Sequence, residues 1–137
     1  MPRKILSQRN FSTPPVAKLI GFHLVQAGKG KAVCRMRTGK KHLNTIGTIH
    51  GGILCDLADA AMGFAFLSLL PSHQTGVTIE FKINFLKPVF PGDLIRASAK
   101  TLFLGKSLFY LECELSNARG KLIAKASSTC KKVSEEN

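Results

Sequence analysis

The segment that decides the fold reads NTIGTIHGGILCDLADAAMGFAFLSLLP and covers residues 44–71. Its apolar run from Ile53 to Leu70 carries Asp56 and Asp59 as its only charges and stops at Pro71. A run of this length and composition predicts a helix that is buried on nearly all sides. A membrane span is not expected, because each aspartate would cost about 2.5–3.5 kcal/mol near the centre of a bilayer.

Upstream of this segment, two short runs predict a β-hairpin. They cover Ile20 to Gln26 and Lys31 to Thr38, on either side of the turn-forming Ala-Gly-Lys-Gly. Gly39 to Thr48 is polar and contains glycine, which predicts a loop that leads into the helix.

Downstream, the hydrophobic pattern changes to alternation, which is typical of strands with one buried face. In the first run Ile79, Phe81, Ile83 and Phe85 form the apolar set, and Thr78 falls in the polar set. Further strands are predicted over residues 95–103, 109–115 and 122–130.

One long helix combined with antiparallel strands is an α+β arrangement. Burial of that helix on most sides requires a sheet of five to six strands to curve around it, as in a hot-dog fold. A flat sheet packed on one helix face gives a similar pattern and remains an alternative.

With 137 residues, the chain has the size of one domain. We divide it into an N-terminal arm (1–15), a domain (16–132) and a charged tail (133–137). The four cysteines are far apart and form no C-x-x-C pair, so we expect reduced, mostly structural thiols and a cytoplasmic protein. The basic N-terminus lacks the apolar run of a secretory signal, although its composition also resembles a mitochondrial transit peptide.

The net charge of +12 is unevenly distributed, because ten Lys and Arg residues and no acidic residue precede Asp56. Such a field attracts anions. Nucleic acid, an acidic membrane surface and a phosphorylated small molecule such as coenzyme A all fit, and so does a solvated basic surface without a partner. Nucleic acid is not expected, because the chain has no helix-turn-helix, zinc-finger or aromatic RNA-binding signature.

Gly51 and Gly52 lie at the predicted helix start, where backbone N–H groups have no intrahelical partner. Without Cβ atoms, these residues let a carbonyl oxygen approach the amides closely, as an oxyanion site requires. The alternative is that they are turn residues only.

Asp59 lies well inside the apolar run, where a buried carboxylate is costly unless it is paired or functional. Desolvation would raise its pKa toward the range of a general base. Asp56, three residues earlier, is an alternative for this role, and either aspartate can instead serve in an ion pair or accept hydrogen bonds from a loop.

Helix geometry separates the two candidate groups. A rise of 1.5 Å per residue places Asp59 about 13 Å along the axis from His50. One substrate carbonyl cannot reach both ends of this distance. If Asp59 and the glycine amides serve the same reaction, they come from different subunits of a two-fold dimer with two composite sites.

The pattern Asn44-x-x-Gly47-x-x-His50-Gly51-Gly52-x-x-x-x-Leu57-x-Asp59-x-Ala61 resembles the signature of hot-dog thioesterases of the phenylacetic-acid-pathway (PaaI) type. The resemblance covers roughly residues 16 to 131. Its other matches, in the family's order and spacing, are Gly76-Val-Thr-Ile, Phe85-Leu-Lys-Pro88, Gly92-Asp93, Gly105-Lys106-Ser107 and Gly120-Lys-Leu-Ile-Ala124.

The resemblance implies hydrolysis of an acyl-CoA thioester to a free acid and coenzyme A, without metal or cofactor. It assigns polarisation of the thioester carbonyl to the Gly51 amide and orientation of the attacking water to Asp59. It also implies that Asn44 and His50 help to hold the thioester and that Thr78 contacts the water. A covalent mixed anhydride on Asp59 remains an alternative mechanism.

The resemblance gives Asp56 no counterpart, so a structural role is expected for it. Gly52 is expected beside the substrate, and Lys106 and Ser107 are expected to contact the phosphates of coenzyme A unless they form an ordinary solvated turn. A homodimer, itself paired into a dimer of dimers, is the expected assembly. The competing functions are a non-catalytic acyl-CoA-binding hot-dog module and a hot-dog dehydratase.

Overall fold

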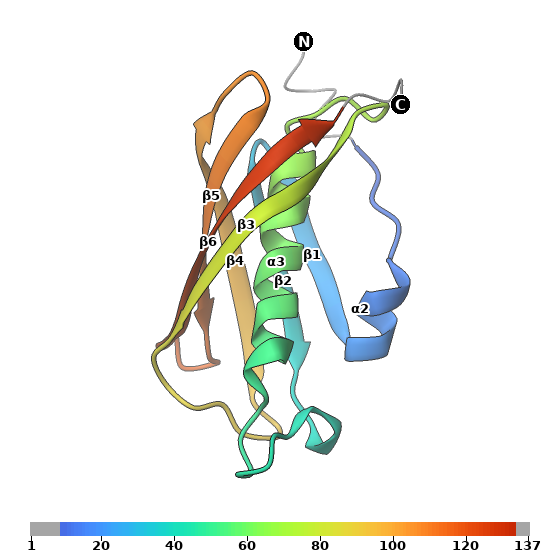
Figure 1. Ribbon diagram of the computed structural model, residues 1–137. Coiled ribbons are helices and arrows are strands. Elements are labelled where there is room, and N and C mark those ends of the chain that lie inside the picture. Colours follow the sequence, from blue (N-terminus) through green and yellow to red (C-terminus); the bar gives the residue numbers. More distant parts are fainter. Residues whose placement is uncertain (1–8, 134–137) are drawn as a thin grey trace.

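The structure is a computed structural model that describes residues 9–133 (Figure 1). Its elements are α2 (Pro15–Ile20), β1 (Phe22–Gly28), β2 (Lys31–Arg37), the 3₁₀ turn η1 (Lys40–His42), α3 (Gly51–Leu67), β3 (Thr75–Phe85), β4 (Leu94–Leu104), β5 (Leu108–Ser116) and β6 (Leu122–Val133). The strands form one sheet in the order β1-β2-β4-β5-β6-β3, and all neighbours are antiparallel.

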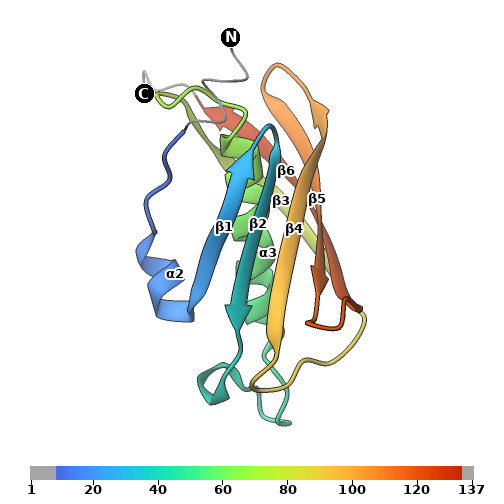
Figure 2. The same ribbon diagram turned by 180° about the vertical axis from the view of Figure 1, so that it is seen from behind.

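The sheet curves around α3, which lies on its concave side between the edge strands β1 and β3 (Figures 1 and 2). The prediction of an α+β fold with a long helix in a curved antiparallel sheet is confirmed, with six strands. Within residues 9–133, no helix has both the length and the hydropathy that a membrane span requires.

Helix α3 packs against the sheet through one face only. Its fully buried residues include Leu57, Ala58, Ala61 and Ala65, and the small alanines let the helix axis approach the strands. The prediction of burial on nearly all sides is wrong, because Asp56 and Asp59 are exposed. The edge strands β1 and β3 do not meet, so a strip of α3 remains uncovered by the sheet; we call it the open face.

The chain before β1 forms a short helix that the sequence analysis did not predict. Pro15 is at a first-turn position of α2, where its fixed φ suits a helix and its missing N–H costs nothing. Gly21 ends α2 with a φ of +100°, and its amide donates to the carbonyl of Ala17. Ile20, expected to begin the first strand, therefore belongs to α2, and β1 starts at Phe22.

A β-bulge in β3 changes which side chains face the helix. Thr78 pairs with Cys130 and Glu80 pairs with Thr129, which leaves Ile79 as the extra residue. Residues directly opposite each other share a face, so the bulge puts Thr78 on the same face as Phe81. The prediction of one alternating buried face is wrong at its ends, because Ile79 and Phe85 are 54% and 51% exposed.

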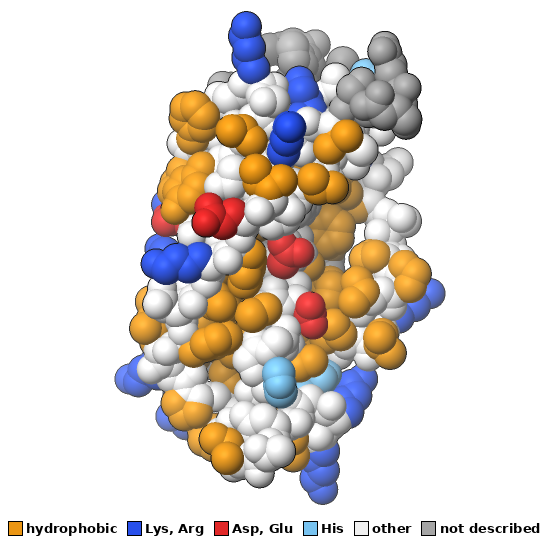
Figure 3. Space-filling model, in the orientation of Figure 1, with side chains coloured by type: hydrophobic (Ala, Val, Ile, Leu, Met, Phe, Trp, Pro, Cys, Tyr) orange, Lys and Arg blue, Asp and Glu red, His pale blue; other side chains and the backbone are white. Residues whose placement is uncertain are grey.

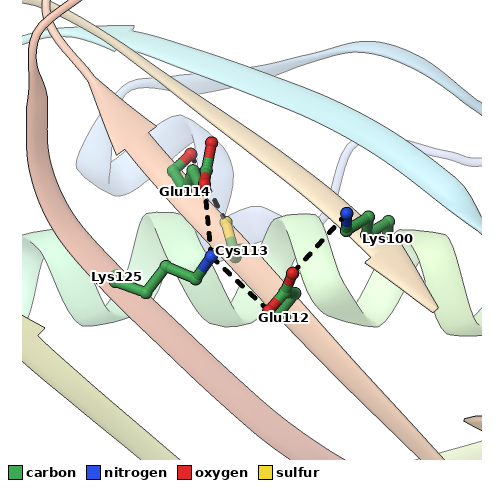
Figure 4. A network of polar contacts seen from close by, with 5 residues as sticks. All are labelled: Lys100, Glu112, Cys113, Glu114 and Lys125. Atoms are coloured by element: carbon green, nitrogen blue, oxygen red, sulfur yellow. Dashed lines mark hydrogen bonds and ion pairs between the residues drawn. The ribbon is translucent and has the colours of Figure 1, made fainter. Parts of the chain in front are cut away.

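The outer face of the sheet carries a polar network that spans three strands (Figure 4). Glu112 on β5 lies 3.6 Å from Lys100 on β4 and 3.4 Å from Lys125 on β6. Lys125 also donates to Glu114, and this hydrogen bond is the main cause of the raised pKa of Lys125. These exposed pairs help to fix the strand register and contribute little to stability.

The cysteines of the described chain are free thiols, as predicted. Burial raises the pKa of both Cys34 and Cys113 to about 12, so these thiols stay protonated and unreactive. Cys130 is buried next to Thr78, and burial raises its pKa as well.

Gly76, near the start of β3, is a position where a side chain has no room. A Cβ there would overlap the Lys131 carbonyl oxygen and the Phe66 ring. Gly76→Ala is therefore expected to destabilise the fold by about 2 kcal/mol, measured by denaturant unfolding. Gly39→Ala is the control, because a Cβ at Gly39 meets nothing within 4 Å, and its unfolding midpoint should not change. Equal midpoints for the two variants would contradict this prediction.

Candidate active site

The candidate catalytic carboxylate, Asp59, lies on the open face of α3 next to the edge strand β3. The hydroxyl of Thr78 donates a hydrogen bond of 3.0 Å to Asp59 Oδ1. This contact exists because the bulge at Ile79 turns Thr78 toward the helix. The structure thus brings together two of the predicted site residues from different elements.

A groove of about 350 Å³ opens at Asp59 and Thr78. Apart from Asp56, Asp59 and Thr78, its lining is apolar or glycine: Pro14, Val16, Phe22, Ala60, Gly63, Phe64 and Leu67. Figure 3 views this side of the molecule and shows acidic side chains among apolar ones in the middle, with Lys and Arg mainly around the margin. The contribution of Pro14 and Val16 was not anticipated, because they lie at the arm's end and in an unpredicted helix.

The expected burial of Asp59 is not found within one chain. Its carboxylate is exposed, because the apolar neighbours that surround it in sequence point toward the sheet while Asp59 points to the open face. Covering the open face would be needed to exclude water from this carboxylate.

Asp56 lines the same groove and is also exposed. Partial burial, and secondarily the charge of Asp59, raise its pKa. Within the described residues we find no hydrogen bond to its side chain, whereas Asp59 is held by Thr78. The geometry therefore favours Asp59 over Asp56 as the positioned carboxylate.

The start of α3 presents the second part of the predicted site. The Gly52 amide donates to His50 Nδ1 at 2.9 Å, so the His50 ring caps the helix. Gly51 occupies the first helical position, where the amide has no intrahelical acceptor. A Cβ on Gly51 would come within 2.9 Å of the Phe85 ring, so only glycine leaves this position uncrowded.

Gly51 and Asp59 line different hollows of the chain. Gly51 lines a second hollow of about 470 Å³ together with Phe85 and residues of the β3–β4 connection. None of the residues that line it also lines the groove at Asp59. A single chain therefore does not offer the amide and the carboxylate to one ligand atom.

Asn44 and His50 lie in the loop that leads into α3. The Asn44 side chain is engaged within this loop: its Nδ2 donates to Thr48 Oγ1 at 2.7 Å, and its Oδ1 accepts from the amides of Ile46 and Thr48. His50 is exposed beside the glycines. Asn44 therefore shapes the loop that presents His50 and Gly51, and direct contact of Asn44 or His50 with a thioester stays a prediction.

His42 supports the same loop and was missed by the sequence analysis. It is buried, its Nε2 lies 2.7 Å from the Ile20 carbonyl oxygen, and its Nδ1 accepts from the Gly39 amide. The His42 carbonyl accepts from the His50 amide. Nothing in its polar, basic surroundings in the sequence distinguishes it from a solvated histidine.

Lys106 and Ser107 lie in the exposed turn between β4 and β5 and do not line the groove at Asp59. The structure therefore does not bring them to the carboxylate within one chain. As for metals, residues 9–133 contain no cluster of three or more His, Cys, Asp or Glu side chains that could hold an ion.

A long helix cradled by a curved six-stranded antiparallel sheet is the hot-dog fold. The thioesterase superfamily model matches residues 46–124, and the chain belongs to this superfamily. The predicted family resemblance is thereby confirmed.

Relatives named as acyl-CoA thioesterases agree with this assignment. Acyl-coenzyme A thioesterase 13 of Homo sapiens is 36% identical over 107 residues, which cover 77% of this chain and 76% of the relative. The acyl-coenzyme A thioesterase PaaI of Escherichia coli is 32% identical over 108 residues, or 79% of this chain and 75% of the relative. The structure of the PaaI protein from the E. coli phenylacetic acid degradation operon superposes with a TM-score of 0.83 at 29% identity, covering 89% of this chain and 86% of that one.

Proposed function

We propose that this protein hydrolyses acyl-CoA thioesters to a free carboxylic acid and coenzyme A, with Asp59 orienting and activating the attacking water. The observation that carries this proposal is the hydrogen bond of 3.0 Å that fixes Asp59 Oδ1 in a groove whose lining, apart from Asp56, Asp59 and Thr78, is apolar or glycine. A positioned carboxylate accepts the proton of the water as it attacks the thioester carbonyl. The acyl-CoA thioesterase names of two relatives support coenzyme A as the leaving group.

The Gly51 amide supplies the complementary half of the site. As the carbonyl becomes tetrahedral, negative charge develops on its oxygen, and a backbone N–H at a helix start stabilises that charge. The Gly52 amide already donates to His50, so the Gly51 amide is the donor we assign to the carbonyl oxygen.

Two subunits together form each site in this proposal. About 12 Å of helix separates Asp59 from Gly51 at the start of α3, and the two groups line separate hollows. A two-fold dimer that sets the open face of one α3 against the helix start of the other places both groups on one carbonyl and covers Asp59. The pairing of two such dimers into a tetramer remains a prediction.

The test of this function is thiol release from a panel of acyl-CoAs with straight-chain and arylacetyl groups. Free thiol appearing with turnover, in equal amount to the free acid, supports hydrolysis. A protein that binds acyl-CoA without releasing thiol would instead support the non-catalytic module, and an enoyl absorbance without thiol would support a dehydratase.

The basic charge predicts that ionic strength affects substrate binding more than catalysis. Lys106→Gln is expected to raise KM about fivefold at low salt without changing kcat, because glutamine lacks the positive charge with which Lys106 would bind a phosphate of coenzyme A. Added salt should shrink this difference by screening. Steady-state kinetics at several salt concentrations measure it, with Lys121→Gln in the β5–β6 turn as the matched control. The same KM for both variants at every salt concentration would remove this role from Lys106.

A further inference from the structure

A third hollow lies next to the groove at Asp59 and shares lining residues with it. It has a volume of about 270 Å³ and is lined mainly by residues 11–14 and by the start of β1. This third hollow and the groove at Asp59 have three lining residues in common: Pro14, Phe22 and Phe64. These three side chains therefore form a wall between the hollows.

Phe64 is the member of this wall that comes from α3. It follows Asp59 by five residues, so its Cα lies about 7.5 Å further along the helix axis. It is half-buried, whereas Phe22 is buried with 3% exposure in the core. Replacing Phe64 by a smaller residue therefore removes part of the wall between the groove and the third hollow, and it disturbs the buried core less than a change at Phe22 would.

The arm holds Phe64 in place. The Phe11 ring meets the Phe64 ring edge-to-face, with 5.2 Å between centroids and an interplanar angle of 72°. The Arg9 guanidinium lies 5.8 Å from the centroid of Phe11. Between these contacts and α2, residues 9–14 run along the open face of α3 (Figure 1).

Arg9 fastens this segment to the last residue of α3 and to the connection between α3 and β3. Its Nη1 lies within hydrogen-bond distance of four carbonyl oxygens, those of Leu67, Leu70, Pro71 and Gln74, at 3.3, 3.4, 3.0 and 3.0 Å. Carbonyl oxygens carry partial negative charge, so a cluster of four suits a cation, although those of Leu67 and Pro71 also accept from the amides of Leu70 and Gln74. Because Nη1 carries two N–H bonds, the four carbonyl oxygens share its two donors.

We propose that Phe64, held by the Arg9–Phe11 contact, is the specificity-determining residue that limits the length of the acyl group. This inference rests on the proposed function, which puts the thioester carbonyl at Asp59. The acyl chain then extends along the apolar part of the groove toward Phe64. Chains that end before the wall bind fully. Longer chains meet the Phe64 ring and leave methylene groups in water, which lowers their relative kcat/KM.

Phe64→Ala is the direct test. It joins the groove to the hollow beyond Phe64, so the ratio of kcat/KM for hexadecanoyl-CoA to that for butanoyl-CoA should rise at least tenfold. Phe64→Leu and Arg9→Ala should shift the ratio in the same direction by smaller factors. Arg37→Ala is the matched control, because Arg37 Nη1 donates to the Gly92 carbonyl at 2.9 Å outside the groove, and it should leave the ratio unchanged.

A binding measurement separates failure of this inference from failure of the proposed function. Calorimetry with non-hydrolysable butyl, octyl, dodecyl and hexadecyl thioethers of coenzyme A gives the length dependence of Kd for each variant. Phe64→Ala should tighten the long thioethers selectively. If the unaltered protein binds no thioether and releases no thiol, the proposed function fails; if it does both and every folded Phe64 and Arg9 variant keeps the original length profile, only the inference about Phe64 is overturned.

Discussion

Replacing Asp59 by Asn is expected to lower kcat for acyl-CoA hydrolysis about a thousandfold, because an amide cannot accept the proton of the attacking water. Asn keeps the shape of the side chain and an oxygen that accepts from the Thr78 hydroxyl, so the groove should stay intact. Thiol release measures the loss of activity. Denaturant unfolding checks that the fold is retained, since the exposed side chain contributes little to the core.

Asp56→Asn is the matched control for this prediction. It changes an exposed aspartate in the same groove, less than one helical turn away, and should lower kcat by no more than a few-fold. If Asp56→Asn abolished activity and Asp59→Asn did not, the assignment of the two aspartates would have to be exchanged.

Removing the Gly51 amide is the second change with a large expected effect. Gly51→Pro deletes the N–H at the first helical position, where proline fits the backbone. His50 precedes it with φ −58° and ψ 133°, an extended conformation that a following proline favours. Loss of one oxyanion donor should lower kcat about a hundredfold to a thousandfold relative to Gly51→Ala.

Gly51→Ala is the control because it adds the same Cβ but keeps the amide. That Cβ approaches the Phe85 ring to 2.9 Å in both variants, so the crowding cancels in the comparison. The exposed Phe85 ring can move aside. Equal kcat values for the Pro and Ala variants would show that the Gly51 amide does not stabilise the transition state.

Mixing inactive subunits tests whether the two groups meet across a dimer. Asp59→Asn and Gly51→Pro chains, co-expressed in equal amounts, form about half mixed dimers, and each has one intact site, so about a quarter of the original activity should return. Asp59→Asn mixed with Thr78→Ala should give no more activity than the Thr78→Ala chains supply by themselves, because both residues belong to the same half of a site. Absence of recovery in the first mixture, or a monomer in sedimentation, contradicts the composite site.

Local features of this protein could be predicted from its sequence. The apolar run predicted α3, and alternation predicted the strands from β3 to β6, because both are repeating patterns that depend on near neighbours in the chain. The pattern from Asn44 to Ala61 also pointed to Asp59 and Gly51 as candidate site residues, because an acid inside an apolar run and glycines at a helix start are uncommon. Ile20 was misplaced because Pro15 and Gly21 define a helix that is too short to show a period.

The tertiary structure decided how these elements meet. The bulge at Ile79, which turns Thr78 toward Asp59, is set by the register of β3 against β6, and the strict alternation in the sequence concealed it. The exposure of Asp59 follows from a sheet whose edges stay apart, and the wall at Phe64 depends on Phe11, more than fifty residues earlier. Such contacts join residues that are distant in the chain, so they depend on the packing of the whole fold, whereas a periodic pattern reports only which face of an element is apolar.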